Sequence, residues 1–192
     1  MKGVIFTEFL ELVETGFGME VADQVITRGC PFHKTGFTSV GSYDHRDLIS
    51  MVSELSKVTD APVPDLVRGF GKHMFKNFLQ NYPDAFERVS STFEMLLRVE
   101  DVIHVEVKKL NPDAELPSFQ FPATDEGTLD VVYKSVRPFA DLAHGLIEAC
   151  IEHFDEELSV TRVDLEGEPG THAIFSLKPH VNSEFNEANS MK

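Results

Sequence analysis

The chain has 192 residues, which is enough for one domain with an enclosed cavity and short for two domains. Its composition, 42% hydrophobic and 26% charged, is typical of a globular protein and argues against wholesale disorder. Acidic residues outnumber basic ones by 32 to 17, and the formal net charge of -15 repels nucleic-acid phosphates and anionic lipid headgroups. We therefore expect neither nucleic acid nor a membrane as a partner.

Apolar residues in the first half of the chain recur three and four positions apart, which is the pattern of amphipathic helices. Glycine, proline and capping residues divide this pattern into segments. The expected helices cover residues 3–15, a second segment that ends at Arg28, and residues 44–57, 62–82 and 84–110, with a loop over residues 29–43.

The second half changes to the alternating or short apolar runs that are typical of strands. Turn residues at 125–127 and 167–170 separate neighbouring runs and predict two antiparallel hairpins, hence a four-stranded sheet. We expect a single domain over residues 1–180 and a polar, frayed tail over residues 181–192. The expected strands lie near residues 119–121, 129–135, 158–165 and 171–177, with one helix over residues 139–154 between the hairpins.

The first apolar segment and the two cysteines indicate in which cellular compartment the protein is expected. Residues 4–13 are interrupted by a threonine and two glutamates and lack a small-residue cleavage site, so no signal peptide is expected. No other segment has the apolar length that crosses a bilayer, and we expect a cytoplasmic protein. Cys30 and Cys150 form no disulfide framework, and the pair Cys30 and His33 would need two distant ligands to hold zinc, so no zinc site is expected.

One histidine, His104, is predicted to point inward from a helix. It lies seven positions after Leu97 and three before Val107, within an apolar stripe. His73 and His144 share their helix faces with charged residues and are expected to be solvated. An inward histidine is more often a core residue than a metal ligand, so His104 alone does not define a site.

Three polar residues, Tyr133, Ser135 and Arg137, alternate along a predicted strand. At roughly 3.3 Å per residue they would present a phenol, a hydroxyl and a guanidinium within about 13 Å on one face. This row of donors suits an anion with several oxygens, such as a carboxylate. A solvent-facing strand edge would show the same spacing. The spacing alone therefore does not distinguish an anion-binding site from a solvated edge.

The Tyr133-x-Ser135-x-Arg137 pattern, preceded by the segment R-V-E-D-V-I-H that ends at His104, resembles the H-NOX family of haem-based gas sensors. The resemblance extends from the Met1-Lys2-Gly3 opening to the last predicted strand. It implies the α+β H-NOX fold, with a helical N-terminal half and a four-stranded antiparallel sheet, and a b-type haem as cofactor.

The resemblance also implies roles for particular residues. His104 corresponds to the proximal iron ligand, and Tyr133, Ser135 and Arg137 correspond to the residues that hold the haem propionates. Pro117, thirteen positions after the histidine, corresponds to the proline that presses on the haem. Tryptophan is absent, so the aromatic contacts fall to phenylalanines. The macrocycle also needs an apolar slot, although most of its residues would be ordinary core in another fold. The expected slot residues are Ile5, Phe9, Met74, Phe78, Leu142 and Leu146.

Leu142 implies a choice among gases. Oxygen-binding H-NOX proteins carry a distal tyrosine at the position five after the motif arginine, which is Leu142 here. Iron-bound oxygen favours a hydrogen-bond donor, whereas nitric oxide does not. Tyr43 and Tyr82 do not match the distal position, and Met74 is only a weak acceptor, so the pocket is expected to be apolar throughout and to favour nitric oxide, with carbon monoxide as a further ligand.

The resemblance implies a sensor that is not an enzyme and acts on a separate partner, a histidine kinase or a diguanylate cyclase/phosphodiesterase, after nitric oxide releases the proximal histidine. A peroxidase-like haem enzyme would need distal acid–base groups, which Leu142, Met74 and Phe9 do not offer. A cofactor-free binding module for an anionic apolar ligand would use a similar arginine-lined pocket and stays as the alternative.

Overall fold

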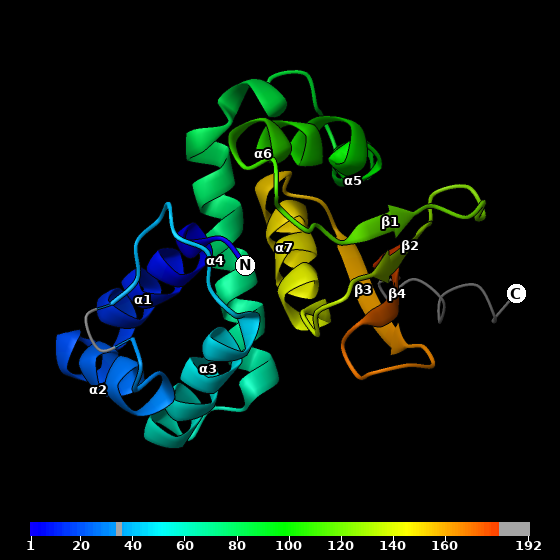
Figure 1. The fold of residues 1–192 in the computed structure, drawn as a ribbon. Helices are drawn as coiled ribbons and strands as arrows, with labels where there is room; N and C mark the ends of the chain where they lie inside the picture. The colour runs from blue at the N-terminus through cyan, green and yellow to red at the C-terminus, as the bar shows by residue number, and fades with distance from the viewer. Residues whose placement is uncertain (34–35, 181–192) are drawn as a thin grey trace, which may run out of the picture.

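The N-terminal part of the computed structural model, which describes residues 1–33 and 36–180, consists of helices, as predicted. They are α1 (Gly3–Phe17), α2 (Met19–Gly29), α3 (His45–Thr59) and α4 (Val63–Asn81). Gly18 ends α1 with a φ of 91°, a conformation that favours glycine. The Asp44 carboxylate caps α3 by accepting a hydrogen bond from the Arg46 N–H at 2.9 Å. Figure 1 shows α1, α2 and α3 gathered on one side of α4.

The single helix expected over residues 84–110 is wrong. The structure has a 3-10 turn (Pro83–Ala85), then α5 (Thr92–Leu97), a π turn (Val99–Ile103) and α6 (His104–Leu110). Ser91 caps α5 by accepting the Glu94 N–H at 3.2 Å, and the Glu94 carboxylate accepts the Ser90 N–H at 3.0 Å. The sequence S-T-F-E at 91–94 is a capping-box pattern, which starts a new helix within the apolar periodicity.

The C-terminal part contains the expected four-stranded antiparallel sheet, in the order β1-β2-β4-β3. Its strands are β1 (Ser118–Gln120), β2 (Leu129–Lys134), β3 (Leu158–Asp164) and β4 (His172–Pro179). The intervening helix, α7 (Ala140–His153), packs its small and aliphatic residues against the inward-facing side chains of β2 and β4. The expected tail, residues 181–192, lies outside the described residues. Within the described part of the chain, no helix is long and apolar enough to cross a membrane.

Two glycines bring α4 and α7 into close contact and so join the helical part to the sheet (Figure 1). A Cβ atom on Gly145 would lie 2.0 Å from the Arg68 carbonyl oxygen, and one on Gly71 would lie 2.3 Å from the Leu142 carbonyl oxygen. Both distances are far inside van der Waals contact. The backbones of α4 and α7 can therefore pack at this distance only without side chains at these positions.

Gly145→Ala is expected to lower the free energy of unfolding by about 1–3 kcal/mol, because the new methyl group forces α4 and α7 apart. Thermal unfolding measures the change, at about 2–4 °C in Tm per kcal/mol for a chain of this size. Gly69→Ala is the matched control: it lies on the exposed side of α4, where a Cβ meets nothing within 4 Å, so it should be neutral or stabilising. A Gly145→Ala protein as stable as Gly69→Ala would contradict the tight packing.

His144 is buried, contrary to the expectation that it is solvated; it is 7% exposed. Its Nδ1 lies 3.2 Å from Arg68 Nη2, and its ring packs against Phe175 with 5.5 Å between centroids. Burial lowers the pKa of the His144 imidazole, and the Arg68 charge lowers it further. The charged residues on this face of α7 pair with residues of α4 and β3, as in Arg162–Asp141 at 2.6 Å. The prediction for His73 holds only in part, since His73 is half-buried.

Candidate functional site

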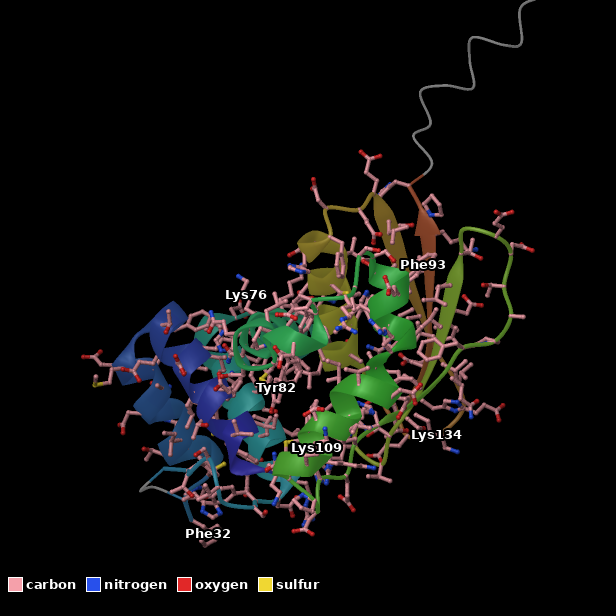
Figure 2. The ribbon with its side chains drawn as sticks, turned by 90° about the horizontal axis from the view of Figure 1, so that it is seen from above. Phe32, Lys76, Tyr82, Phe93, Lys109 and Lys134 are labelled. Carbon is pink, nitrogen blue, oxygen red and sulfur yellow. The ribbon has the colours of Figure 1, made fainter. Side chains whose placement is uncertain are left out.

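A cavity of about 800 Å³ lies between the helical part and the sheet. This volume is within the range of about 300–1,000 Å³ that is usual for ligand and cofactor sites. Residues from α1, α4, the segment 95–117, β1, β2 and α7 line it. Figure 2 shows α6, marked by Lys109, between the blue N-terminal helices and the strands of the sheet. Segments far apart in the sequence therefore line one cavity.

His104 reaches the cavity from the first residue of α6, as its place on the apolar stripe predicts. Its side chain is 12% exposed, and its Nδ1 lies 3.1 Å from Glu100 Oε2. The other carboxylate oxygen, Glu100 Oε1, accepts the Phe119 N–H at 2.7 Å. With Nδ1 engaged by the carboxylate, Nε2 is the ring nitrogen left to act as a ligand.

Tyr133, Ser135 and Arg137 also meet at the cavity, although not along one strand. β2 ends at Lys134, and Ser135 and Arg137 lie in the turn after it. The Ser135 hydroxyl accepts the Arg137 N–H at 3.1 Å, and the Tyr133 O–H donates to the Arg137 carbonyl at 3.5 Å. Burial raises the pKa of the Tyr133 phenol, so this group stays a neutral donor. The end of β2 and the turn after it therefore connect the three residues through the Arg137 backbone.

Arg137 is largely buried, with its side chain 13% exposed, and its guanidinium faces the loop that joins α6 to β1. Nη1 donates to the Glu115 carbonyl at 2.8 Å, and Nη2 pairs with the Glu115 carboxylate. Lys2 is a second cation on the cavity wall, 4.0 Å from Asp113. Lys2 was expected only as part of the opening tripeptide, and its place at the cavity was not predicted.

Most of the expected slot residues line the cavity, namely Ile5, Met74, Phe78, Leu142 and Leu146, and so does Pro117. Phe9 does not line it: the ring is 1% exposed and packs edge-to-face on Phe70, with centroids 5.4 Å apart. On α1, Ile5 and Glu8 face the cavity, and Phe9, one residue further around the helix, faces the core between α1 and α4.

The cavity wall is not apolar throughout, contrary to the expectation. Glu8, Asn77, Asn81 and Tyr82 line it on the side of α1 and α4. The Asn77 amide donates to the Glu8 carboxylate, which also lies 3.4 Å from His73 Nε2. Asn77 and Asn81 each come three positions after an apolar lining residue, a spacing that could have indicated polar groups on this wall. The wall formed by α7 is aliphatic at Leu142 and Leu146.

Cys150 also lines the cavity, and its thiolate form would bind a metal ion. Burial raises the pKa of its thiol to about 12. A thiolate is the form that ligates iron, so Cys150 is a poor ligand at neutral pH. His104 is left as the better axial donor in the cavity.

These residues fit a haem. The cofactor needs an axial donor, partners for two carboxylates and an apolar slot. The cavity offers His104 as the donor, Tyr133, Ser135 and Arg137 as partners, and the aliphatic and aromatic walls of α1, α4 and α7 as the slot. The fold and this donor set define a haem-binding domain.

Comparison with known proteins identifies the family. The sequence profile of the Haem-NO-binding family matches residues 2–162. The chain belongs to this family, called H-NOX in its solved structures, whose members are non-catalytic haem-binding domains. Haem is therefore its cofactor. No protein among curated sequences matches the chain significantly.

Solved H-NOX structures resemble the chain over nearly its whole length. The ferrous unliganded H-NOX protein from K. algicida is 35% identical, with a TM-score of 0.86, over 95% of this chain and 98% of that one. The H-NOX from Shewanella woodyi, solved with IWP-051 in the ferrous carbon monoxide state, is 36% identical, with a TM-score of 0.79, over 97% and 98%. The S. oneidensis H-NOX, in its ferrous nitric oxide state, is 23% identical, with a TM-score of 0.84, over 94% and 100%, a likeness of fold.

Proposed function

We propose that this protein is a haem-based nitric oxide sensor that controls a separate signalling protein. The observation that carries the proposal is the convergence of His104, the Tyr133–Ser135–Arg137 turn and an aliphatic α7 wall on one cavity. Membership of the Haem-NO-binding family supports it. Ferrous haem supplies a metal centre that binds a diatomic gas; the protein residues decide which gas binds and how the protein responds.

The residues divide the work of holding haem. His104 ligates the iron through Nε2, and the Arg137 guanidinium pairs with a propionate as a charge-assisted fork. Ser135, in the same turn, and Tyr133, near the end of β2, donate further hydrogen bonds, and Pro117 packs against the ring. Their placement on α6, β2, the turn after β2 and the loop before β1 links the cofactor to both halves of the fold.

Signalling results from the release of His104 when nitric oxide binds. α6 has only seven residues, between a π turn and the loop 111–117, and none of its described side chains is fully buried. A short helix bound mainly through one metal ligand can shift when that ligand is freed. The shifted helix then changes the surface that a histidine kinase or a diguanylate cyclase/phosphodiesterase contacts.

Nitric oxide is favoured over oxygen because the α7 wall lacks a hydrogen-bond donor at Leu142. Leu142→Tyr is expected to raise oxygen affinity by up to roughly tenfold, since one hydrogen bond contributes about 1 kcal/mol and somewhat more to a charged acceptor. Oxygen titration of the ferrous protein, monitored by absorption, measures the change. The gain falls if nothing holds the new phenol in place.

Tyr82→Phe is the control, because Tyr82 already lines the cavity on another wall. It should leave oxygen and nitric oxide binding unchanged, since the proposal assigns it no contact with the gas. Weaker oxygen binding in Tyr82→Phe, or a stable oxygen complex of the unmodified protein in air, would overturn the selectivity proposal.

A further inference from the structure

We propose that Glu100 is a positioning residue that fixes the ring of His104 and couples it to strand β1; this rests on the proposed role of His104 as iron ligand. Each oxygen of the Glu100 carboxylate has its own partner. Oε2 lies 3.1 Å from His104 Nδ1, and Oε1 accepts the Phe119 N–H at 2.7 Å. One side chain therefore joins α6 to the edge of the sheet.

The direction of the first hydrogen bond is set by its partner. A carboxylate accepts, so Nδ1 carries the proton and Nε2 keeps the lone pair that faces the cavity. A carboxylate behind a ligating imidazole fixes its tautomer and makes it a stronger donor to the metal. Glu100 thus strengthens the bond that nitric oxide must break.

The local backbone accounts for the pairing. The π turn (Val99–Ile103) starts directly before Glu100 and ends directly before His104, whose N–H donates to the Val99 carbonyl five residues back. Such turns add a residue to a helix and occur often at functional sites. Glu100 and His104 are four positions apart, so one helical turn places the carboxylate beside the imidazole, and the same carboxylate reaches the Phe119 N–H in β1.

Phe119 carries the connection further. Its ring lies 5.7 Å from that of His104 and 5.8 Å from that of Tyr133, its partner in the β1–β2 register. Phe119 therefore lies in contact with both His104 and Tyr133. A shift of His104 would displace Phe119 and, through it, Tyr133 in β2.

The test compares Glu100→Gln and Glu100→Asp with Asp101→Asn, an exposed neighbour that loses the same charge. The iron–histidine stretching frequency of the ferrous haem protein, measured by resonance Raman spectroscopy without any gas, is the main readout. Glu100→Gln should lower this frequency and speed haem loss by about tenfold. Glu100→Asp should restore part of the shift, and Asp101→Asn should match the unmodified protein.

Amide hydrogen exchange of the haem protein supplies a second readout. In Glu100→Ala the Phe119 amide should exchange about tenfold faster, because its acceptor is gone. An unchanged iron–histidine frequency in Glu100→Gln, or an equal shift in Asp101→Asn, would overturn the proposal. This frequency is recorded without nitric oxide. An unchanged frequency would therefore contradict the role of Glu100 but not nitric oxide sensing, and a protein that does not respond to nitric oxide would contradict sensing but not the role of Glu100.

Discussion

His104→Gly is expected to yield a protein that holds haem only when imidazole is supplied. His104 is the only histidine among the described residues that line the cavity, and burial keeps the Cys150 thiol protonated. Removal of the imidazole side chain leaves a space of its own shape, which free imidazole can fill. Absorption spectra of the purified variant, with and without imidazole, measure haem retention directly.

Val105→Gly is the matched control for this variant. It adds a glycine to the same short helix, where glycine costs about 1 kcal/mol relative to good helix formers, but Val105 is 43% exposed and not among the cavity-lining residues. It should keep its haem without imidazole. Normal five-coordinate haem in His104→Gly without imidazole would show that another residue ligates the iron.

Arg137→Ala is expected to lose haem about tenfold faster or more than the unmodified protein. A charge-assisted hydrogen bond contributes about 1.5–3 kcal/mol, against about 0.5–1.5 kcal/mol for a neutral one. Tyr133→Phe and Ser135→Ala should therefore cause smaller losses. Haem transfer to an excess of apomyoglobin, monitored by absorption, gives the three rates.

Glu115→Gln is the control for Arg137, because the Glu115 carboxylate pairs with the same guanidinium. Freed from this partner, Arg137 should hold a propionate at least as well, and haem loss should not accelerate. If Arg137→Ala, Tyr133→Phe and Ser135→Ala all retain haem as well as the unmodified protein does, none of the three residues holds the cofactor.

Most helix and strand limits were predictable because single residues mark them. Gly18 ends α1 and Asp44 begins α3, close to the expected limits of residues 3–15 and 44–57, and alternation located β2 and β4. Residues 84–110 were not predictable from periodicity, since a capping box and a π turn leave apolar residues three and four apart. The pattern of a broken helix then looks like that of a continuous one.

The candidate site was predictable where a family pattern marks it and unpredictable where it depends on neighbours. His104 and the Tyr133–Ser135–Arg137 motif reach the cavity as expected. Phe9 and His144 were misplaced because a helix face does not reveal which element covers it. Glu100 lies four positions before His104, a spacing that could have indicated the pair. Its contact with the Phe119 N–H was not predictable, because that contact forms only when β1 packs beside the π turn.

The absorption spectrum of the purified ferrous protein, recorded in air, under carbon monoxide and under nitric oxide, tests nitric oxide sensing most directly. We expect a Soret band of five-coordinate haem that air leaves in place apart from slow oxidation, a shift with carbon monoxide, and with nitric oxide the spectrum of haem that has lost its axial histidine. A stable oxygen complex in air, an axial histidine retained under nitric oxide, or no Soret band at all would contradict it.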